Sequence, residues 1–378
     1  MNTPFVFGKI ASDEYFTNRT VEISQLSSNF QSLVNTIIIS PRRWGKSSLV
    51  KKAAEEASKI DKNIKFCFID MYNVRSEEQF YQLLAQETLK VLSSKLDEIL
   101  EISRSYLTRI IPTISFNPDP MNDFSISMDW EQVKKQPDEI LDFAEKIAQS
   151  KKIKLMICID EFQNISGFGQ PVEFQKKLRS HWQKHQYVGY CLFGSKRHML
   201  LDVFSSQSMP FYNFGHLLFL NKISEEHWIP FIVKRFQETG KKISPENAKM
   251  ICAYAENHSF YVQQLAHLAW LNSENICNAE QVTRAYENLL LQLSFLYQSI
   301  TDGLSNTQLS FLEAVLKGEE KFSSKEIIKT YNLGTSANVS RIKQALTEKE
   351  IIESVGNEIE FLDPMYKSWL SKHYFKLY

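Results

Sequence analysis

In the first 220 residues, apolar positions fall into short runs separated by stretches with helical periodicity. Several runs are unbroken by polar residues, which is typical of parallel strands buried on both faces. The stretches between them repeat apolar residues every three or four positions, as amphipathic helices do. Strands that alternate with helices predict an α/β fold with a parallel sheet, which binds ligands at the carboxyl ends of its strands. The predicted strands are residues 37–39, 64–70, 154–160, 187–195 and 217–220.

The pattern changes near residue 224, beyond which apolar residues keep helical spacing alone. Stretches at residues 246–256, 262–270 and 279–296 predict short helices packed in an all-α domain. His258 comes before the second stretch. We predict that it caps that helix or packs in the core. Contact with a nucleotide is the less favoured alternative.

The last part of the chain has a different organisation. Three amphipathic helices after residue 303 are followed by Gly356-Asn357 between two alternating strands, a two-residue hairpin signal. Three helices and a hairpin predict a winged helix-turn-helix, which either binds DNA or serves as a protein-contact or autoinhibitory module. On the third helix, the residues predicted to face DNA are Ser336, Asn338, Arg341 and Lys343. Acidic residues that would repel phosphates on the hairpin are Glu353, Glu358 and Glu360.

Candidate chemistry first appears at the end of the strand at residues 37–39. A polar turn there leads into Gly45-Lys46-Ser47 and a helical stretch, as in phosphate loops of the pattern G-x-x-x-x-G-K-[ST]. The positive end of the helix would hold a phosphate, Lys46 would reach the β- and γ-phosphates, and the Ser47 hydroxyl would ligate Mg²⁺. The alternative is a chance Gly-Lys-Ser. The predicted nucleotide-binding residues are Ser40, Pro41, Arg42, Arg43, Trp44, Gly45, Lys46, Ser47 and Ser48.

Ser40 stands where this pattern has its first glycine. A residue before proline is pushed to an extended conformation, which an L-residue adopts easily, so Pro41 makes a glycine unnecessary at this position. Gly45 is the more demanding position, because backbone must approach phosphate closely there. Arg42 and Arg43 either stabilise transition-state charge or are ordinary surface arginines.

The unbroken apolar run in residues 154–160 ends in Asp160-Glu161. In a phosphate-loop enzyme, the first acid would hold Mg²⁺ through water and the second would polarise the attacking water. Acids at the end of an apolar strand are common, but their place downstream of the loop in a strand–helix alternation favours a functional role. Ser195 ends the next strand and is predicted to sense the γ-phosphate. Its neighbours Lys196 and Arg197 are alternatives, and so is an ordinary strand-end turn.

Two segments around this core have less specific patterns. Residues 21–30 show helical spacing with Asn18 as the predicted cap. This helix either folds over a nucleotide base or is an ordinary packing helix. In residues 113–128, apolar positions alternate on both sides of a turn rich in Pro, Asp and Asn, which predicts a β-hairpin insertion.

Composition narrows the class of protein. The chain has 378 residues, of which 43% are hydrophobic and 23% charged, as expected for a soluble globular protein of two or three domains. Lys+Arg and Asp+Glu are both 44, so bulk charge does not indicate a nucleic-acid binder, although a local patch is compatible with a neutral total. Five scattered cysteines and the lack of a long apolar run favour a cytoplasmic protein with no membrane partner.

Together these features predict an α/β P-loop NTPase core with a parallel sheet, followed by an α-helical lid and a winged helix-turn-helix domain. The predicted domains are residues 1–222, 223–300 and 301–378. The motifs occur in the same order as in the archaeal/bacterial ATPase family, which the chain resembles over nearly its whole length. That family belongs to the STAND branch of AAA+-like P-loop ATPases. The resemblance is carried by residues 16–19, 40–49, 159–163, 194–195, 258–261 and 359–370.

The resemblance implies an ATPase with ATP/ADP and Mg²⁺ as cofactors. Its relatives act as nucleotide-driven switches in signalling, transcription or defence. Ser40 and Ser259 stand where the family usually has Gly and Pro, and these departures bear on nucleotide affinity or turnover more than on the fold. The implied roles are phosphate and metal binding by Lys46 and Ser47, metal binding by Asp160, base catalysis by Glu161 and sensing by Ser195.

Three functions remain open at this point. The first is an ATP-hydrolysing molecular switch, in which Mg-ATP binds between core and lid and hydrolysis repositions the winged helix. The second is a nucleotide-gated DNA-binding regulator, and the third is a protein-interaction adaptor whose nucleotide is structural. The expected partners are therefore a nucleotide, with DNA or a protein at the winged helix, and a nucleotide-dependent oligomer is compatible with each function.

Overall fold

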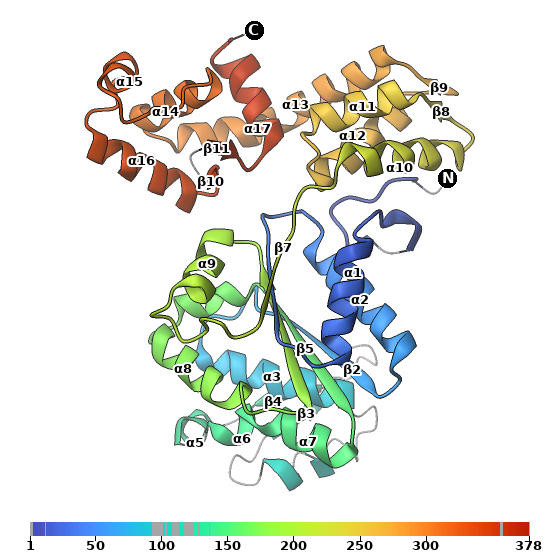
Figure 1. Ribbon diagram of the computed structural model, residues 1–378, viewed down its shortest axis with the longest axis vertical. Helices are drawn as coiled ribbons and strands as arrows, with labels where there is room; N and C mark the ends of the chain where they lie inside the picture. Colours follow the sequence, from blue (N-terminus) through green and yellow to red (C-terminus); the bar gives the residue numbers. More distant parts are fainter. Residues whose placement is uncertain are drawn as a thin grey trace. The chain divides into compact units, whose positions relative to one another are not determined.

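The structure is a computed structural model that describes residues 3–377 except 12, 93–100, 103, 108–112, 117–123, 128, 136 and 356–357. The chain divides into two units (Figure 1). We call residues 19–221 the sheet unit, and residues 1–18 together with 222–378 the helical unit. Each unit has a hydrophobic core of its own.

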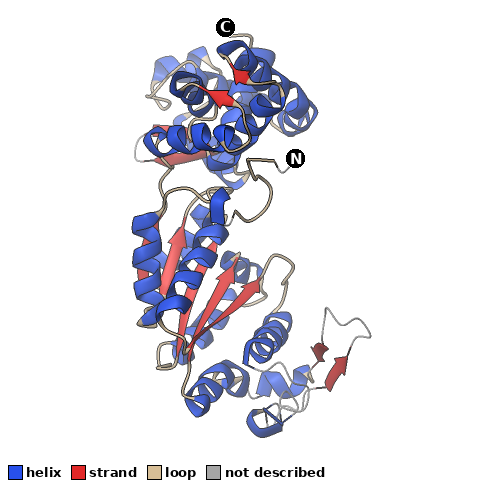
Figure 2. Cartoon of the chain, turned by 90° about the vertical axis from the view of Figure 1, so that its right-hand side faces the viewer, coloured by secondary structure: helices blue, strands red, loops and turns tan. Residues whose placement is uncertain are grey.

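A five-stranded parallel sheet in the order β2-β5-β6-β1-β7 runs through the sheet unit (Figure 2). These strands are β1 Thr36–Ile39, β2 Ile64–Asp70, β5 Lys154–Asp160, β6 Val188–Gly194 and β7 His216–Phe219. The spatial order differs from the chain order, so β6 lies between β1 and β5. All strands point the same way, and their carboxyl ends therefore share one edge of the sheet.

Helices cover both faces of this sheet (Figure 1). They are α1 Thr20–Gln31, α2 Lys46–Ile60, α3 Glu77–Leu92, α5 Trp130–Lys135, α6 Asp138–Leu141, α7 Phe143–Lys151, α8 Pro171–Trp182 and α9 Arg197–Ser205. Alternate strand residues face opposite sides, so Ile37 and Ile39 join the core beneath α3, α7, α8 and α9. On the opposite face α1 packs along α2, and Phe30 of α1 meets Phe66 of β2 with ring centroids 5.5 Å apart.

The helical unit begins with a group of four longer helices. Its helices are α10 Glu225–Gln237, α11 Pro245–Tyr254, α12 Ser259–Leu271, α13 Ala279–Asp302, α14 Asn306–Leu316, α15 Lys325–Thr330, α16 Ser336–Glu348 and α17 Pro364–Trp369. Short strands β8 Lys242–Ile243 and β9 Ile276–Cys277 pair in parallel. The N-terminal segment packs here, because Phe5 lies against Phe231 and Phe236 of α10, and Arg235 Nε donates to the Pro4 carbonyl at 2.7 Å.

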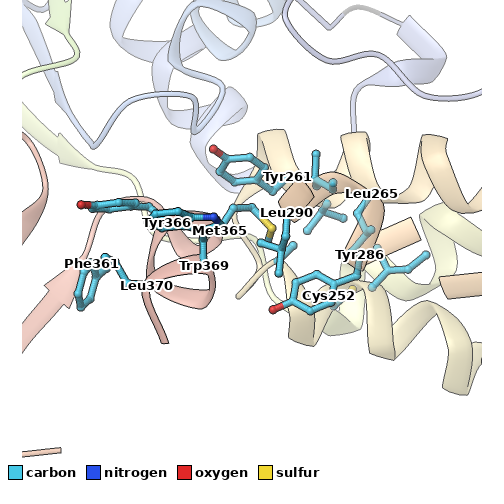
Figure 3. Packing of buried hydrophobic residues seen from close by; sticks show 14 of the residues in the cluster. Cys252, Tyr261, Leu265, Tyr286, Leu290, Phe361, Met365, Tyr366, Trp369 and Leu370 are labelled. Carbon is cyan, nitrogen blue, oxygen red and sulfur yellow. The ribbon is translucent and has the colours of Figure 1, made fainter. Parts of the chain in front are cut away.

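The winged helix shares a core with the helical domain before it. Helices α14, α15 and α16 lead to an antiparallel hairpin of β10 Ile352–Val355 and β11 Glu358–Phe361. Tyr366 and Trp369 of α17 belong to this core (Figure 3). Their ring centroids lie 5.2 and 5.9 Å from that of Tyr297 of α13. The carboxylate of Asp363, which caps α17, accepts hydrogen bonds from Tyr261 of α12 at 2.6 Å and from Tyr297 at 3.2 Å.

The predicted fold class is confirmed as α/β, with a parallel sheet followed by helices and a winged helix. The hairpin insertion is also confirmed as β3 Thr113–Phe116 paired with β4 Phe124–Ser127, although its turn lies outside the described residues. The predicted Asn18 cap is wrong. Asn18 and Arg19 both have positive φ, and no side chain caps α1. Within the described residues, we find no helix with the length and apolar character that a bilayer crossing requires.

Candidate functional site

The polar residues predicted to act together follow β1, β6 and β5, three neighbouring strands of the sheet. Ile39 at the end of β1 pairs with Gly194 at the end of β6, so Ser40 and Ser195 emerge side by side. Asp160 is the last residue of β5, on the other flank of β6. The phosphate-loop residues, the two acids and Ser195 therefore meet at one edge of the sheet.

The backbone of the loop before α2 contains two residues in the left-handed region. Gly45 has φ +87° and precedes the first residue of α2, with open space where a Cβ would lie. Arg43 has φ +61°. No side chain caps the N-terminus of α2, which leaves a helix end of the kind that holds anions. Ser40 lies outside the positive-φ region, in agreement with the expectation that Pro41 removes the need for glycine there.

The Lys46 ammonium is buried against this loop. Its Nζ donates to the Pro41 carbonyl at 2.7 Å, to the Ser40 carbonyl at 3.1 Å and to the Ser40 hydroxyl at 3.3 Å. Lys46 is only 6% exposed, so its charge is held by neutral oxygens of the loop in a largely dry environment. A phosphate oxygen would supply a stronger acceptor than these carbonyls.

Ser47 and Asp160 are in direct contact. The Ser47 hydroxyl donates to Asp160 Oδ2 at 2.7 Å, and the backbone N–H of Glu161 donates to Oδ1 at 2.8 Å. Burial raises the pKa of the Asp160 carboxyl, and these two hydrogen bonds oppose the shift without cancelling it. A partly buried carboxylate beside a hydroxyl presents two oxygen ligands of the kind that Mg²⁺ prefers.

Glu161 turns away from Asp160 and toward the end of β6. It has φ +53°, an uncommon conformation for this residue type. Its Oε2 accepts hydrogen bonds from the Ser195 hydroxyl at 2.9 Å, from the Ser195 backbone N–H at 3.4 Å, and from the Gln163 amide. The Nε of Arg42 in turn donates to the Ser195 hydroxyl at 3.2 Å. A chain of hydrogen bonds thus connects the loop arginine to the second acid through Ser195.

Two residues of this arrangement lie in segments that carry the resemblance, but the sequence analysis gave them no role. Gln163 is fully buried and holds Glu161, while its own Oε1 finds no hydrogen-bond partner. Gly194 makes room for it, because a Cβ at position 194 would lie 1.8 Å from Gln163 Oε1. A glycine at the end of an apolar strand was the only available signal, and it does not name the side chain that uses the space.

The remaining predicted residues lie around this centre. Arg43 is exposed, Trp44 is partly exposed, and Ser48 is buried in the first turn of α2. Lys196 comes directly before α9 and Arg197 is its first residue, and both are partly exposed. Of these three neighbours, Ser195 is the one that contacts Glu161. His258 is a buried residue at the start of α12 in the helical unit.

The winged helix presents fewer of the predicted residues than expected. Ser336 and Arg341 are exposed on α16. Asn338 instead donates to the Leu333 carbonyl at 2.8 Å and so stabilises the turn before α16. Lys343 is partly exposed, and its ammonium lies over the Phe322 ring, 5.1 Å from the centroid, so that its contact with DNA stays a prediction. A surface hollow at the start of α16 is lined by Ser323, Lys325, Ile328, Lys329, Asn332, Gly334 and Ser336.

Comparisons with known proteins agree with this architecture. A family model described as a probable winged helix domain matches residues 295–372. The Walker-type ATPase PABY2304 of Pyrococcus abyssi superposes with a TM-score of 0.68 at 16% identity, covering 97% of this chain and 99% of that one. ORC1 of Aeropyrum pernix in complex with DNA superposes with a TM-score of 0.50 at 13% identity, covering 96% of this chain and 94% of that one. The ADP form of ORC2 from the same organism superposes with a TM-score of 0.51 at 15% identity, covering 94% of this chain and 93% of that one.

No curated protein matches the chain. The structural likeness assigns the fold of a Walker-type ATPase with a C-terminal winged helix, at identities too low to transfer an activity.

Proposed function

We propose that the protein binds Mg-ATP at the carboxyl edge of its sheet and hydrolyses it. The observation that carries this proposal is the 2.7 Å hydrogen bond from Ser47 to Asp160 beside the buried ammonium of Lys46. A hydroxyl, a carboxylate and a lysine at a helix N-terminus form the donor set of a P-loop nucleotide site. The fold shared with Walker-type ATPases supports the same interpretation.

The residues present fit both parts of the ligand. Ser47 and Asp160 would hold Mg²⁺, which usually takes one or two protein oxygens and completes its shell with phosphate and water. Bound Mg²⁺ supplies positive charge to the β- and γ-phosphates. Lys46 would exchange the carbonyls of Ser40 and Pro41 for phosphate oxygens, and the N–H groups at the start of α2 would hold the anion.

Glu161 is the proposed base. Its carboxylate would orient the attacking water and accept its proton, while Gln163 and Ser195 keep it in place through the hydrogen bonds described above. Arg42 connects to the same carboxylate through Ser195 and would add positive charge near the transferred phosphoryl group.

We further propose a molecular switch of the STAND or AAA+-like class. Its parts would be an ATPase core at residues 1–222, a helical lid at 223–300 and a winged helix at 301–378. The contacts of Asp363 with Tyr261 and Tyr297 support joint movement of lid and winged helix, because they tie α17 to α12 and α13. Nucleotide state would then set the position of both domains together.

ATP turnover by the full chain tests the activity. Lys46→Ala and Glu161→Gln should each lower the turnover rate at least tenfold, the first with weaker nucleotide binding and the second without it. Lys59→Ala is the matched control, because Lys59 is an exposed lysine on the same helix. Turnover that is equal in wild type and Glu161→Gln would remove Glu161 as the base, and no nucleotide binding by wild type would refute the whole proposal.

A second candidate function is nucleotide-gated DNA binding. It is favoured by exposed basic residues around the helix-turn-helix, namely Lys325, Lys329 and Arg341. ORC1 of Aeropyrum pernix, a protein of similar fold, was solved with DNA. The acidic hairpin residues Glu358 and Glu360 oppose it, since they are exposed and would repel phosphates.

Fluorescence anisotropy with duplex DNA at two salt concentrations tests this function. Arg341→Ala should weaken binding severalfold and flatten its salt dependence, whereas Lys184→Ala, an exposed cation of the sheet unit, should have no effect. If no nucleotide condition yields binding, the winged helix is left as a protein-contact module.

A further inference from the structure

Helix α13 carries the most exposed large apolar side chain of the described residues. Phe295 is 88% exposed, and its neighbours Leu291 and Leu296 are 63% and 53% exposed. The solvent-facing side of a surface helix normally carries charged residues. Here the sequence from residue 288 to 301 contains no charge at all, although the opposite side of α13 is already buried in the core. This face therefore has the composition of a contact surface.

Six of the exposed residues of α13 form one narrow stripe with the spacing of a coiled-coil seam. Successive members are four, three, four, three and four residues apart, which is the alternation of a and d positions in a heptad. At 100° per residue they lie within an arc of about 80° and extend over roughly 27 Å of helix. All six are exposed: Arg284, Asn288, Leu291, Phe295, Gln298 and Asp302.

The stripe is complementary to itself when its direction is reversed. Its members are arranged symmetrically about position 293, with one apolar, one amide and one charged residue on each side. An antiparallel copy therefore places Leu291 against Phe295, and Asn288 against Gln298. The same arrangement places Arg284 at one end against Asp302 of the other copy, an attractive pair at both ends of the contact.

We propose that a second copy of this chain packs antiparallel against α13, with a twofold axis at residue 293. Such an isologous contact closes on itself and yields a dimer. The two Leu–Phe layers bury the exposed apolar surface, and the terminal Arg–Asp pairs fix the direction and register. A parallel arrangement is disfavoured, because it would place Arg284 against Arg284 and Asp302 against Asp302. The dimer does not depend on ATP hydrolysis.

Sedimentation equilibrium of the nucleotide-free full chain tests the proposal. Wild type should show a concentration-dependent doubling of mass, and Phe295→Glu should remain monomeric at the same concentrations. Leu271→Glu is the matched control and should still dimerise, because Leu271 is an apolar residue, 54% exposed, at the end of a different helix. Circular dichroism checks that each variant is folded.

Charge reversal tests the direction of pairing. Asp302→Arg should weaken the dimer at least tenfold through repulsion from Arg284 of the second copy, and adding Arg284→Asp to it should restore the wild-type association. A wild-type protein that is monomeric at high micromolar concentration would overturn the proposal. So would a dimer that survives Phe295→Glu, or a double reversal that fails to restore association.

Discussion

Replacing Gly194 by alanine tests whether Glu161 must be held by Gln163. The new Cβ would lie 1.8 Å from Oε1 and 2.9 Å from Cδ of Gln163, and 3.3 Å from the Cα of Glu161. Uncharged atoms approach to roughly 3.5 Å, so the amide must retreat by about 1.5 Å. Gln163 is fully buried, so this retreat must displace other packed groups. A retreat of that size breaks its hydrogen bond to Glu161.

Two effects set the size of the change in stability. Forcing an extra methyl group into packed surroundings costs about 1–3 kcal/mol, and losing a hydrogen bond to a charged group costs about 1.5–3 kcal/mol. We therefore expect the free energy of unfolding to fall by roughly 2.5–6 kcal/mol. Turnover should fall by about 10- to 100-fold, because a base displaced by about 1 Å loses its alignment with the attacking water.

Urea denaturation and ATP turnover measure the two effects on the same preparation. Gly167→Ala is the control, because a Cβ at Gly167 meets no atom within 4 Å and its φ is not positive. In the double variant Gln163→Ala/Gly194→Ala, the shortened side chain makes room for the methyl group. It should be no less stable than Gln163→Ala alone. A Gly194→Ala protein with wild-type stability and turnover would refute the reasoning.

Three further predictions concern partly buried carboxylates and are measured by urea denaturation without nucleotide. Asp160→Asn should stabilise the protein at pH 8 but not at pH 4: burial raises the pKa of Asp160, so the native state is destabilised as pH rises through that raised pKa. Asp142→Asn should destabilise by about 1–3 kcal/mol at pH 5.5 and by less at pH 8.5. The hydrogen bond to Asp142 raises the pKa of His181 in the folded protein. The pair therefore stabilises the folded state fully below the pKa of His181 in the unfolded chain, and this stabilisation is lost as pH rises through the pKa of His181 in the folded state. Asp363→Asn should destabilise by about 1.5–3 kcal/mol through its weaker hydrogen bond with Tyr261, and a matching increase in proteolysis between α13 and α14 would support that account.

The meeting of Ser47 and Asp160 could be predicted from sequence, although 113 residues separate them. Unbroken apolar runs identify buried parallel strands, and parallel strands bring their carboxyl ends to one edge. A polar motif directly after each such run is therefore placed by the fold itself. Ser195 follows β6, the strand between β1 and β5, and its place at this edge was predicted in the same way. These positions depend on periodicity and chain direction, which are local properties of the sequence.

The orientation of Glu161 could not be predicted in this way. An extended chain would send the side chains of Asp160 and Glu161 to opposite faces, but Glu161 adopts φ +53° and turns toward Ser195. Positive φ is signalled by Gly, Asn or Asp, and a glutamate gives no such signal. Gln163 was missed because its role depends on the space above Gly194, which belongs to another strand.

Contacts made by long side chains and distant segments were missed for a related reason. Helical spacing places Lys343 near an exposed face, yet its ammonium lies over Phe322 from a preceding loop. Lysine carries a flexible apolar stem, so its charge need not lie where its Cα does. Phe5 similarly packs on α10, more than 220 residues later in the chain, and no local pattern reports such a contact.

From the electrostatics of the proposed site, we expect a magnesium nucleotide to bind better than phosphate alone. The charge of buried Lys46 and that of partly buried Asp160 both have neutral hydrogen-bond partners: loop carbonyls for the ammonium, and a hydroxyl and a backbone N–H for the carboxylate. Their mutual attraction is the smallest influence on the Asp160 pKa. Phosphate alone would place negative charge near a carboxylate whose pKa burial already raises. A ligand that brings phosphate oxygens to Lys46 and a cation to Asp160 satisfies both charges at once.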